Sequence, residues 1–324
     1  MQIMTSGIKP TGKITLGNYI GAIKNFIEYQ DKYNLNVFIA DLHALTIYNN
    51  REELVQNIKD LIKIYIACGL DINKVNLFRQ SKIYTHNQLE WILTCNTDLA
   101  DLTKMPQYKN YCEKHKNEAI PTGMFLYPSL MNADILLYDT EIVPVGEDQK
   151  PHVDLTRDIA EKFNKLYGQT FILPKALVPK QGAKIMSLSD PTKKMSKSES
   201  DKGTIYLLDD IDISIKKIKK ATTDSEFKIY YNKETKPGIS NLLTILSCLS
   251  NKSIEELEEY YKNETNYGVF KKDICDCVYD EINRIQTNIK NIDKIDLTKT
   301  ENKMIEITNK KIETVYKKIG LWDV

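Results

Sequence analysis

Short apolar runs alternate with longer amphipathic stretches through the first half of this chain. Runs typical of buried strands occupy residues 3–5, 36–40 and 75–78. Helical periodicity is present from near Leu16, over residues 52–68 and from Thr85 to about Thr97. Since parallel strands are joined by crossovers that are usually helical, this order predicts an α/β fold with a doubly wound parallel sheet.

The first predicted strand leads through the turn-rich residues 6–12 into a helix that begins near Leu16. Backbone N–H groups at a helix N-terminus bind anions, and Gly17 allows a ligand to come close to the backbone. Asn18 adds a neutral side-chain donor at the same place. Because many strand–helix turns contain a glycine, the segment alone is compatible with a phosphate site and with an ordinary turn.

A second candidate phosphate site lies at residues 190–198, where lysines and serines surround a methionine. Lys194 and Lys197 are close in sequence to hydroxyl side chains, a combination that suits several phosphate oxygens at once. Met195 offers an apolar contact that a fully solvated loop does not need. The ordinary interpretation of such a charge run is a solvated surface, and the alternative is a mobile loop that closes on a triphosphate.

Asp134 stands within an apolar stretch of helical periodicity. Tyr127 and Met131 share its helix face, and Pro128 is expected to open the helix, since its missing N–H costs nothing at the first helical position. An unpaired buried carboxylate is energetically expensive, so Asp134 must have a hydrogen-bonding partner. That partner is either another protein group or an N–H of a ligand held in an aromatic slot beside Tyr127 and Met131.

Further polar positions follow predicted strands, where the carboxyl ends of parallel strands line a ligand crevice. Residues 142–145 form a predicted strand that runs into a Gly-Glu-Asp-Gln loop at 146–149 and then a helix. Asp148 is placed to accept a hydrogen bond from a ribose hydroxyl, and Gln149 to contact the polar end of an amino acid. A lone histidine after the second strand, His43, is predicted to be a pocket wall and not a catalyst.

The composition bounds the partners and the compartment. The formal net charge of +1 excludes a uniformly basic nucleic-acid binder, so any contact with nucleic acid must be a local patch. The 6 cysteines contain no CxxC pair and the 4 histidines are scattered, so no metal-ligand spacing is present. No apolar run approaches membrane-spanning length, and no signal or transit segment is recognisable. We therefore expect an intracellular protein with reduced thiols and no membrane association.

Several segments together resemble the tryptophanyl-tRNA synthetases of bacteria and organelles, over nearly the whole chain. Lys194-Met-Ser-Lys-Ser198 matches the phosphate-binding signature of class I aminoacyl-tRNA synthetases, and Thr15-Leu-Gly-Asn18 resembles a variant of the other signature, His-Ile-Gly-His. The remaining matching segments are residues 6–12, 15–22, 127–134, 143–149, 190–198, 223–225 and 236–241. Two signatures in the right order indicate a nucleotide-binding crevice of the Rossmann-like type.

The resemblance implies ATP-dependent activation of L-tryptophan to tryptophanyl-adenylate and transfer to tRNA(Trp). The residues that act in catalysis would be Asn18, Lys194, Ser196 and Lys197. ATP, as its Mg²⁺ complex, would be held by Lys9, Pro10, Thr11, Thr15, Gly17, Asn18, Gly146, Glu147, Asp148, Ile185, Lys194, Met195, Ser196, Lys197 and Ser198. Tryptophan would be held by Thr5, His43, Tyr127, Met131, Asp134, Val143 and Gln149. The resemblance also implies a homodimer in the cytoplasm or an organelle, and we expect no protein-bound metal.

The chain departs from the family pattern at three places. Lys9 stands where glutamine is frequent and remains a donor, whereas Thr5 stands where phenylalanine is frequent and leaves the pocket wall incomplete. The family has a phosphate-seeking lysine after the position of Gln107. Here that stretch is longer, and the role is open between Lys109, Lys114 and Lys116.

The C-terminal third is predicted to be helical, with helices from about Asp209, after a capping box at 253–256, near 269–290 and near 298–319. We expect a Rossmann-like catalytic domain at 1–200, a helical anticodon-binding domain at 201–290 and a closing helix at 291–324 that packs back toward the catalytic domain. The basic strip Lys216, Lys217, Lys219 and Lys220 is predicted to be solvated. Two alternatives remain: a tyrosyl-type enzyme, because an aspartate also accepts from a phenol, and a non-catalytic relative that binds tRNA or tryptophan.

Overall fold

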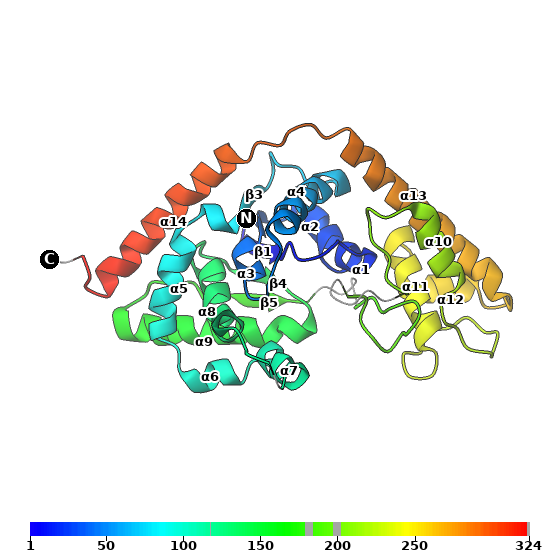
Figure 1. Ribbon diagram of the computed structural model, residues 1–324, viewed down its shortest axis with the longest axis horizontal. Helices are drawn as coiled ribbons and strands as arrows, with labels where there is room; N and C mark the ends of the chain where they lie inside the picture. The colour runs from blue at the N-terminus through cyan, green and yellow to red at the C-terminus, as the bar shows by residue number, and fades with distance from the viewer. Residues whose placement is uncertain (117, 179–183, 197–201, 323–324) are drawn as a thin grey trace.

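A five-stranded, all-parallel sheet forms the centre of the N-terminal part, in the order β3-β2-β1-β4-β5. The computed structural model describes residues 1–116, 118–178, 184–196 and 202–322 (Figure 1). The strands are β1 Ile3–Ile8, β2 Asn34–Ile39, β3 Asn76–Arg79, β4 Ile142–Pro144 and β5 Lys175–Leu177. This order is that of a doubly wound sheet, so the predicted fold class is confirmed.

The first strand is longer than predicted. β1 pairs with β2 from Ile3 opposite Asn34 to Ile8 opposite Ile39, so residues 6–8 are strand and not the start of a loop. This pairing requires glycine at position 7, because the ring of Phe38 lies against its backbone and a Cβ at Gly7 would be only 2.6 Å from that ring. Pairing also satisfies backbone groups that a buried loop would leave without partners.

Helices cover both faces of the sheet, and alternate residues of a strand enter the two cores. Val37 and Ile39 of β2 lie in one core, and Phe38 and Ala40 lie in the other, as the period of a strand requires. The first core includes α1 Leu16–Asn18, a π-helical turn Tyr19–Ile23, α2 Lys24–Tyr29 and α4 Arg51–Cys68. The second includes α5 Thr85–Cys95, α6 Leu99–Thr103, α8 Thr122–Leu136 and α9 Lys150–Tyr167.

The prediction that Pro128 opens a helix is wrong. α8 begins at Thr122, and Pro128 lies inside it. Upstream residues Met124 and Tyr127 are buried, so the apolar surface of the helix extends before the proline. This burial outweighs the missing hydrogen bond at an interior proline.

Four helices form the C-terminal bundle: α10 Ile211–Lys219, α11 Pro237–Ser250, α12 Ile254–Tyr260 and α13 Tyr267–Lys290. The predicted capping box opens α12, since Ser253 Oγ accepts from Glu256 N at 3.2 Å and Glu256 Oε2 accepts from Ser253 N at 2.7 Å. α13 packs against α4 as well as against α10 and α11. The bundle therefore shares one continuous core with the nearer face of the sheet.

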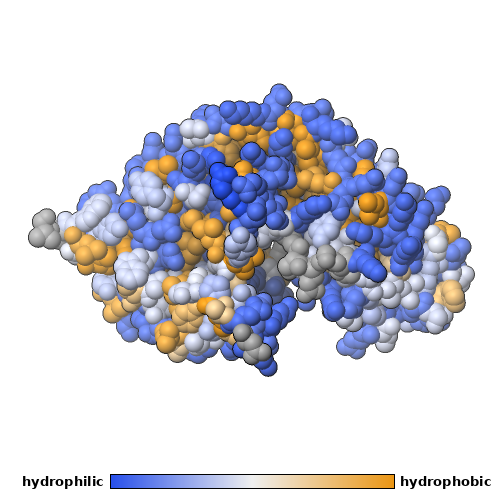
Figure 2. Space-filling view, in the orientation of Figure 1, coloured by the Kyte–Doolittle hydropathy of each residue, from blue (hydrophilic) through white to orange (hydrophobic). Residues whose placement is uncertain are grey.

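The chain then crosses back over the molecule. α14 Thr298–Lys318 packs against β3 and α5, far from the bundle it has left (Figure 1). Arg79 at the end of β3 fixes this helix, because its Nε and Nη2 donate to the two carboxylate oxygens of Glu301 at 2.7 and 2.8 Å. On the opposite side the surface is indented between the sheet-containing part and the bundle (Figure 2). Within the described ranges, no helix combines the length and apolar character needed to cross a bilayer.

Candidate active site

A cavity of about 280 Å³ lies where β1, β2 and β4 end, and α8 closes it from the side. This volume is close to the lower end of the range of roughly 300–1,000 Å³ that is typical of small-molecule sites. The predicted residues that line it are Thr5, Lys9, His43, Tyr127, Met131, Asp134 and Gln149. The position at the carboxyl ends of the strands is the one that doubly wound sheets use for ligands.

Asp134 is held by three side chains and still faces the cavity. Its Oδ2 lies 2.7 Å from His43 Nε2, and its Oδ1 accepts from Gln80 Nε2 at 2.6 Å. His86 Nδ1 also lies 2.7 Å from Oδ1. The sequence-based expectation that Asp134 has a partner is therefore confirmed.

The Asp134 carboxyl is ionised despite being almost fully buried. Burial alone raises its pKa, but the charge interactions and hydrogen bonds with His43 and His86 outweigh burial and lower the pKa from 3.8 to about 2. Because the carboxylate carries the negative charge, His43 Nε2 is the donor in their hydrogen bond. An ionised carboxylate has about four lone-pair positions, so three neighbours leave room for one ligand donor.

Gln80 and His86 are site residues that the sequence patterns missed. Gln80 directly follows β3, and its Oε1 also accepts from Leu42 N at 3.1 Å, so it joins two strand ends. Its place after a buried strand was the available signal. His86 lies on α5 with 0% exposure, where its Nε2 contacts Tyr138 Oη at 2.8 Å. No periodicity distinguished it from an ordinary core residue.

Tyr127 and Gln149 face the cavity from opposite elements. The hydroxyl of Tyr127 lies 2.6 Å from His152 Nε2 on α9. Burial lowers the pKa of His152, which favours the neutral ring that accepts this proton. Gln149 donates to Asp148 Oδ2 at 3.3 Å. Both side chains keep hydrogen-bonding capacity for a polar ligand group.

Thr5 lies in a buried polar cluster at the cavity floor. Its hydroxyl lies 2.7 Å from Thr140 Oγ1 and accepts from Asn36 Nδ2 at 3.1 Å. The wall that we expected to be incomplete is thus replaced by a hydrogen-bonded group. Val143, in contrast, is buried in a small cluster with Ile135 and Val153 and does not line the cavity, whereas Val145 does.

The two class signatures lie side by side. Ile185 and Met195 are buried, and their Cβ atoms lie 3.5 Å from where a Cβ of Gly17 would be. Met195 N donates to Ile185 O at 2.9 Å, so the lysine-serine segment forms one arm of a small hairpin. Met195 therefore anchors this arm in the core, as its apolar character suggested. Lys197 and Ser198 lie outside the described residues.

At the helix start, Thr15 and Asn18 form a capping box. Asn18 Oδ1 accepts from Thr15 N at 3.1 Å and from Thr15 Oγ1 at 3.0 Å. Thr15 is fully buried, so its hydroxyl acts on the helix start and does not reach the surface. This arrangement leaves the Asn18 amide group, a donor, available for an anion.

The remaining nucleotide candidates lie in three separate segments. Pro10 is buried and Thr11 half-buried in the turn after β1, and burial of the Lys9 ammonium lowers its pKa. Gly146, Glu147 and Asp148 are exposed just beyond the end of β4. One phosphate contact was left open between three lysines, and all three are exposed on or just after α7 Pro106–Lys114. They are Lys109, Lys114 and Lys116. Only Gln107 of that helix lines the cavity. Across the described ranges, no group of three or more His, Cys, Asp or Glu side chains has the geometry to hold a metal.

Comparisons with known proteins agree with this geometry. A family model described as tRNA synthetases class I (W and Y) matches residues 2–285. The chain is 46% identical to the tryptophan–tRNA ligase of Malacoplasma penetrans, over 99% of this chain and 98% of that one. It is also similar to the solved tryptophanyl-tRNA synthetase of Mycoplasma pneumoniae, with a TM-score of 0.93 and 35% identity over 99% and 98% of the two chains. The Campylobacter jejuni synthetase, solved in complex with ADP and tryptophan, gives a TM-score of 0.77 and 32% identity over 99% and 100%.

Proposed function

Since the chain belongs to the class I tRNA synthetase family of the tryptophan and tyrosine enzymes, we propose that it is a tryptophan–tRNA ligase. It activates L-tryptophan with ATP and transfers the tryptophanyl group to tRNA(Trp). The curated relative at 46% identity and the solved structure at a TM-score of 0.93 both support tryptophan over tyrosine as the amino acid.

The observation that carries this proposal is the position of the ionised Asp134 carboxylate in the lining of a cavity with aromatic and apolar walls. His43, Gln80 and His86 fix the carboxylate, so its orientation does not depend on the ligand. An indole N–H adds a donor to this group, whereas phenylalanine has none to offer. A site that must satisfy a buried polar group rejects analogues lacking the donor by about 10⁴-fold or more.

The amino acid's polar end lies toward Tyr127 and Gln149. In this arrangement His43 and Met131 wall the indole ring, and the α-amino group donates to the Tyr127 and Gln149 oxygens. The α-carboxylate is then directed toward the helix start that carries Gly17 and Asn18. Support for this orientation comes from the cavity itself, because His43, Met131, Tyr127 and Gln149 line it together with Asp134.

In the activation step, the tryptophan carboxylate attacks the α-phosphorus of ATP in line, the new C–O–P bond forms, and pyrophosphate leaves with the electron pair of the broken P–O bond. A carboxylate is already a nucleophile, so no protein base is required. Asn18, Lys194 and Ser196, with Lys197, stabilise the charge that develops on the phosphates. ATP would enter as its Mg²⁺ complex, and the ion would supply further stabilisation of the phosphate charge.

In the second step, the 2′-hydroxyl of the terminal adenosine of tRNA attacks the mixed anhydride and AMP leaves. We assign anticodon binding to the helical bundle at 201–290, with the catalytic domain at 1–200 and the closing helix at 291–324. We also propose a cytoplasmic homodimer.

Amino-acid-dependent ATP–pyrophosphate exchange tests the proposal. We expect exchange with tryptophan and none above background with phenylalanine. Exchange that depends on tyrosine would replace the proposal by the tyrosyl-type alternative. Absence of exchange with every amino acid, combined with tRNA or tryptophan binding, would favour the non-catalytic alternative.

A further inference from the structure

One contact between the helical bundle and the lysine-serine hairpin is made by a buried side chain. Asn241 on α11 is 6% exposed, and its amide makes two hydrogen bonds to one backbone unit. Its Oδ1 accepts from Met186 N at 2.8 Å, and its Nδ2 donates to Met186 O at 2.9 Å. The side chain thus pairs with Met186 as the edge of a neighbouring strand would.

The opposite edge of the same segment carries the lysine arm. Met186 forms an antiparallel bridge with Lys194. The flanking hydrogen bonds run from Ser187 N to Lys193 O at 2.8 Å and from Met195 N to Ile185 O at 2.9 Å. Met186 is therefore placed between Asn241 and Lys194, so a shift of one is transmitted to the other through one residue.

A second tie holds the other end of the hairpin to the bundle. Thr222 N donates to Leu188 O and Thr222 Oγ1 donates to Ser189 O, each at 2.8 Å. Thr222 in turn lies against the first turn of α11, where a Cβ at Gly238 would be only 2.2 Å from Thr222 O. The hairpin and α11 are thus joined at two places.

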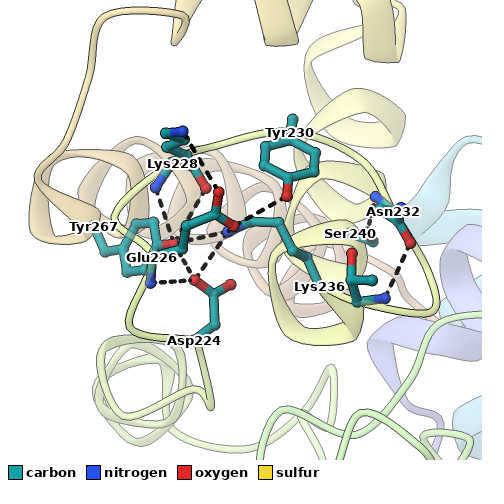
Figure 3. A network of polar contacts seen from close by, with 9 residues as sticks. Asp224, Glu226, Lys228, Tyr230, Asn232, Lys236, Ser240 and Tyr267 are labelled. Atoms are coloured by element: carbon teal, nitrogen blue, oxygen red, sulfur yellow. Dashed lines mark hydrogen bonds and ion pairs between the residues drawn. The ribbon is translucent and has the colours of Figure 1, made fainter.

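The orientation of α11 is itself fixed by a polar cluster at its start (Figure 3). Lys236, 1% exposed, donates to Asp224 Oδ1 at 2.9 Å, to Glu226 Oε2 at 3.0 Å and to Tyr267 Oη at 3.3 Å. Tyr267 belongs to α13, and Lys236 immediately precedes α11. The Lys236 side chain is buried although its carboxylate partners are partly exposed, and its loss of these partners would leave a buried charge unpaired, so the contacts hold the start of α11 in place.

We infer that Asn241 is a positioning residue for ATP activation, which acts through Met186 to hold Lys194 against the leaving phosphates. The inference rests on the proposed function, because it assigns Lys194 to pyrophosphate. It also predicts that the position of the bundle affects nucleotide activation, because Asn241, which positions Lys194, belongs to α11 and not to the sheet. A merely structural Asn241 would only satisfy the buried N–H and C=O of Met186.

A double-mutant cycle separates these two roles. We expect Asn241→Ala to lower kcat of tryptophan-dependent pyrophosphate exchange by about 10–100-fold, since a misplacement of about 1 Å costs up to about 10²-fold. The KM for tryptophan should stay within about twofold. In the Lys194→Ala background, Asn241→Ala should have almost no further effect, because residues that act through one another are not additive.

Ser247→Ala is the matched control. Ser247 is a buried polar residue of the same helix, but its hydroxyl donates to Lys252 O at 2.6 Å, away from the hairpin. We expect it to lower Tm by an amount comparable to Asn241→Ala while leaving exchange unchanged. If Asn241→Ala does not fold, Asn241→Asp, which keeps the acceptor for Met186 N and loses the donor, replaces it in the same cycle.

The outcomes are distinct. An equal fractional loss from Asn241→Ala in the wild-type and Lys194→Ala backgrounds would overturn the inference, as would unchanged exchange in the single variant. A wild-type protein without tryptophan-dependent exchange would instead overturn the proposed function. Loss confined to the background that retains Lys194 would support the inference.

Discussion

His43 and Asp134 are joined by a hydrogen bond of 2.7 Å across 91 residues of sequence. His43 belongs to α3 Asp41–Ala44, which follows β2, and Asp134 lies near the C-terminal end of α8. The bond fixes the buried carboxylate against the end of the central sheet. A charged acceptor is thereby held in place before any amino acid enters, and this pre-organisation is what selectivity for an N–H donor requires.

Replacing the Asp134 carboxylate should impair the use of tryptophan more than the binding of ATP. We expect Asp134→Asn to lower kcat/KM for tryptophan by roughly 10²-fold, because a charge-assisted hydrogen bond worth about 2–3 kcal/mol is lost. The KM for ATP should change little. The measurement is pyrophosphate exchange with each substrate varied. Asp139→Asn is the control, since Asp139 lies just beyond the same helix with φ of 52°, a backbone conformation that asparagine tolerates. Equal damage to both substrates would instead make Asp134 a structural residue.

The same group predicts an acid-sensitive contribution to stability. The folded pKa of Asp134, about 2, is below its ordinary value of 3.8, so ionisation favours the folded state. This stabilisation, about 2 kcal/mol, is fully present above pH about 4 and is lost as the pH falls toward about 2. Urea unfolding of wild type and Asp134→Asn measures it. The difference in unfolding free energy should be constant at neutral pH and shrink as the pH falls from about 4 to about 2, and a difference that is undiminished at pH about 2 would contradict the assignment.

Alanine substitutions of the two neighbouring lysines of the hairpin, Lys193 and Lys194, should differ sharply in their effect on the rate of adenylate formation. Lys194→Ala removes a donor from the charge that develops in the transition state, and such donors contribute about 3–4 kcal/mol, or 10²–10³ in rate. Lys193 is exposed and lies 3.5 Å from Asp190, so Lys193→Ala should change the rate by no more than about twofold. Single-turnover formation of tryptophanyl-adenylate distinguishes them, and equal effects would exclude a specific role for Lys194.

The packing of the closing helix α14 should depend on the ion pair between Arg79 and Glu301. Glu301 is 5% exposed and accepts from Arg79 N at 3.3 Å in addition to the two guanidinium hydrogen bonds. Glu301→Gln should lower the free energy of unfolding by about 2–4 kcal/mol, because the buried guanidinium contact loses its charge partner.

The control lies on the same helix. Glu313 forms an exposed ion pair with Lys317 at 2.8 Å, and Glu313→Gln should cost no more than about 0.5 kcal/mol. Chemical denaturation of both variants provides the measurement. A similar cost for both would show that α14 is held by its apolar face alone.

Local patterns predicted much of the fold. The strands at 36–40 and 75–78, the helix over 52–68 and the capping box of α12 all follow from short-range chemistry. Two boundaries failed for one reason. Gly7 and Pro128 read as turn or start signals in isolation, but long-range pairing with β2 and burial of the helix before Pro128 overrode those signals.

The candidate site divides in the same way. Asp134 was identified because an acid in an apolar helix demands a partner, and the two phosphate signatures were identified by residue type and spacing. The partners of these side chains could not be predicted from the sequence. Gln80 and His86 contact Asp134, and His152 contacts Tyr127, but all three lie in segments whose docking depends on the whole sheet and its covering helices.

The sequence by itself determined the order of strands and helices, the need for a partner at Asp134 and the two phosphate-binding segments, since each depends on the chemistry of neighbouring residues. Only the tertiary structure decided which donors surround that carboxylate, that Val145 and not Val143 faces the cavity, and that Asn241 of the bundle supports the lysine arm. These are contacts between residues distant along the chain. They exist because parallel strand pairing and helix packing bring separate segments within hydrogen-bonding distance.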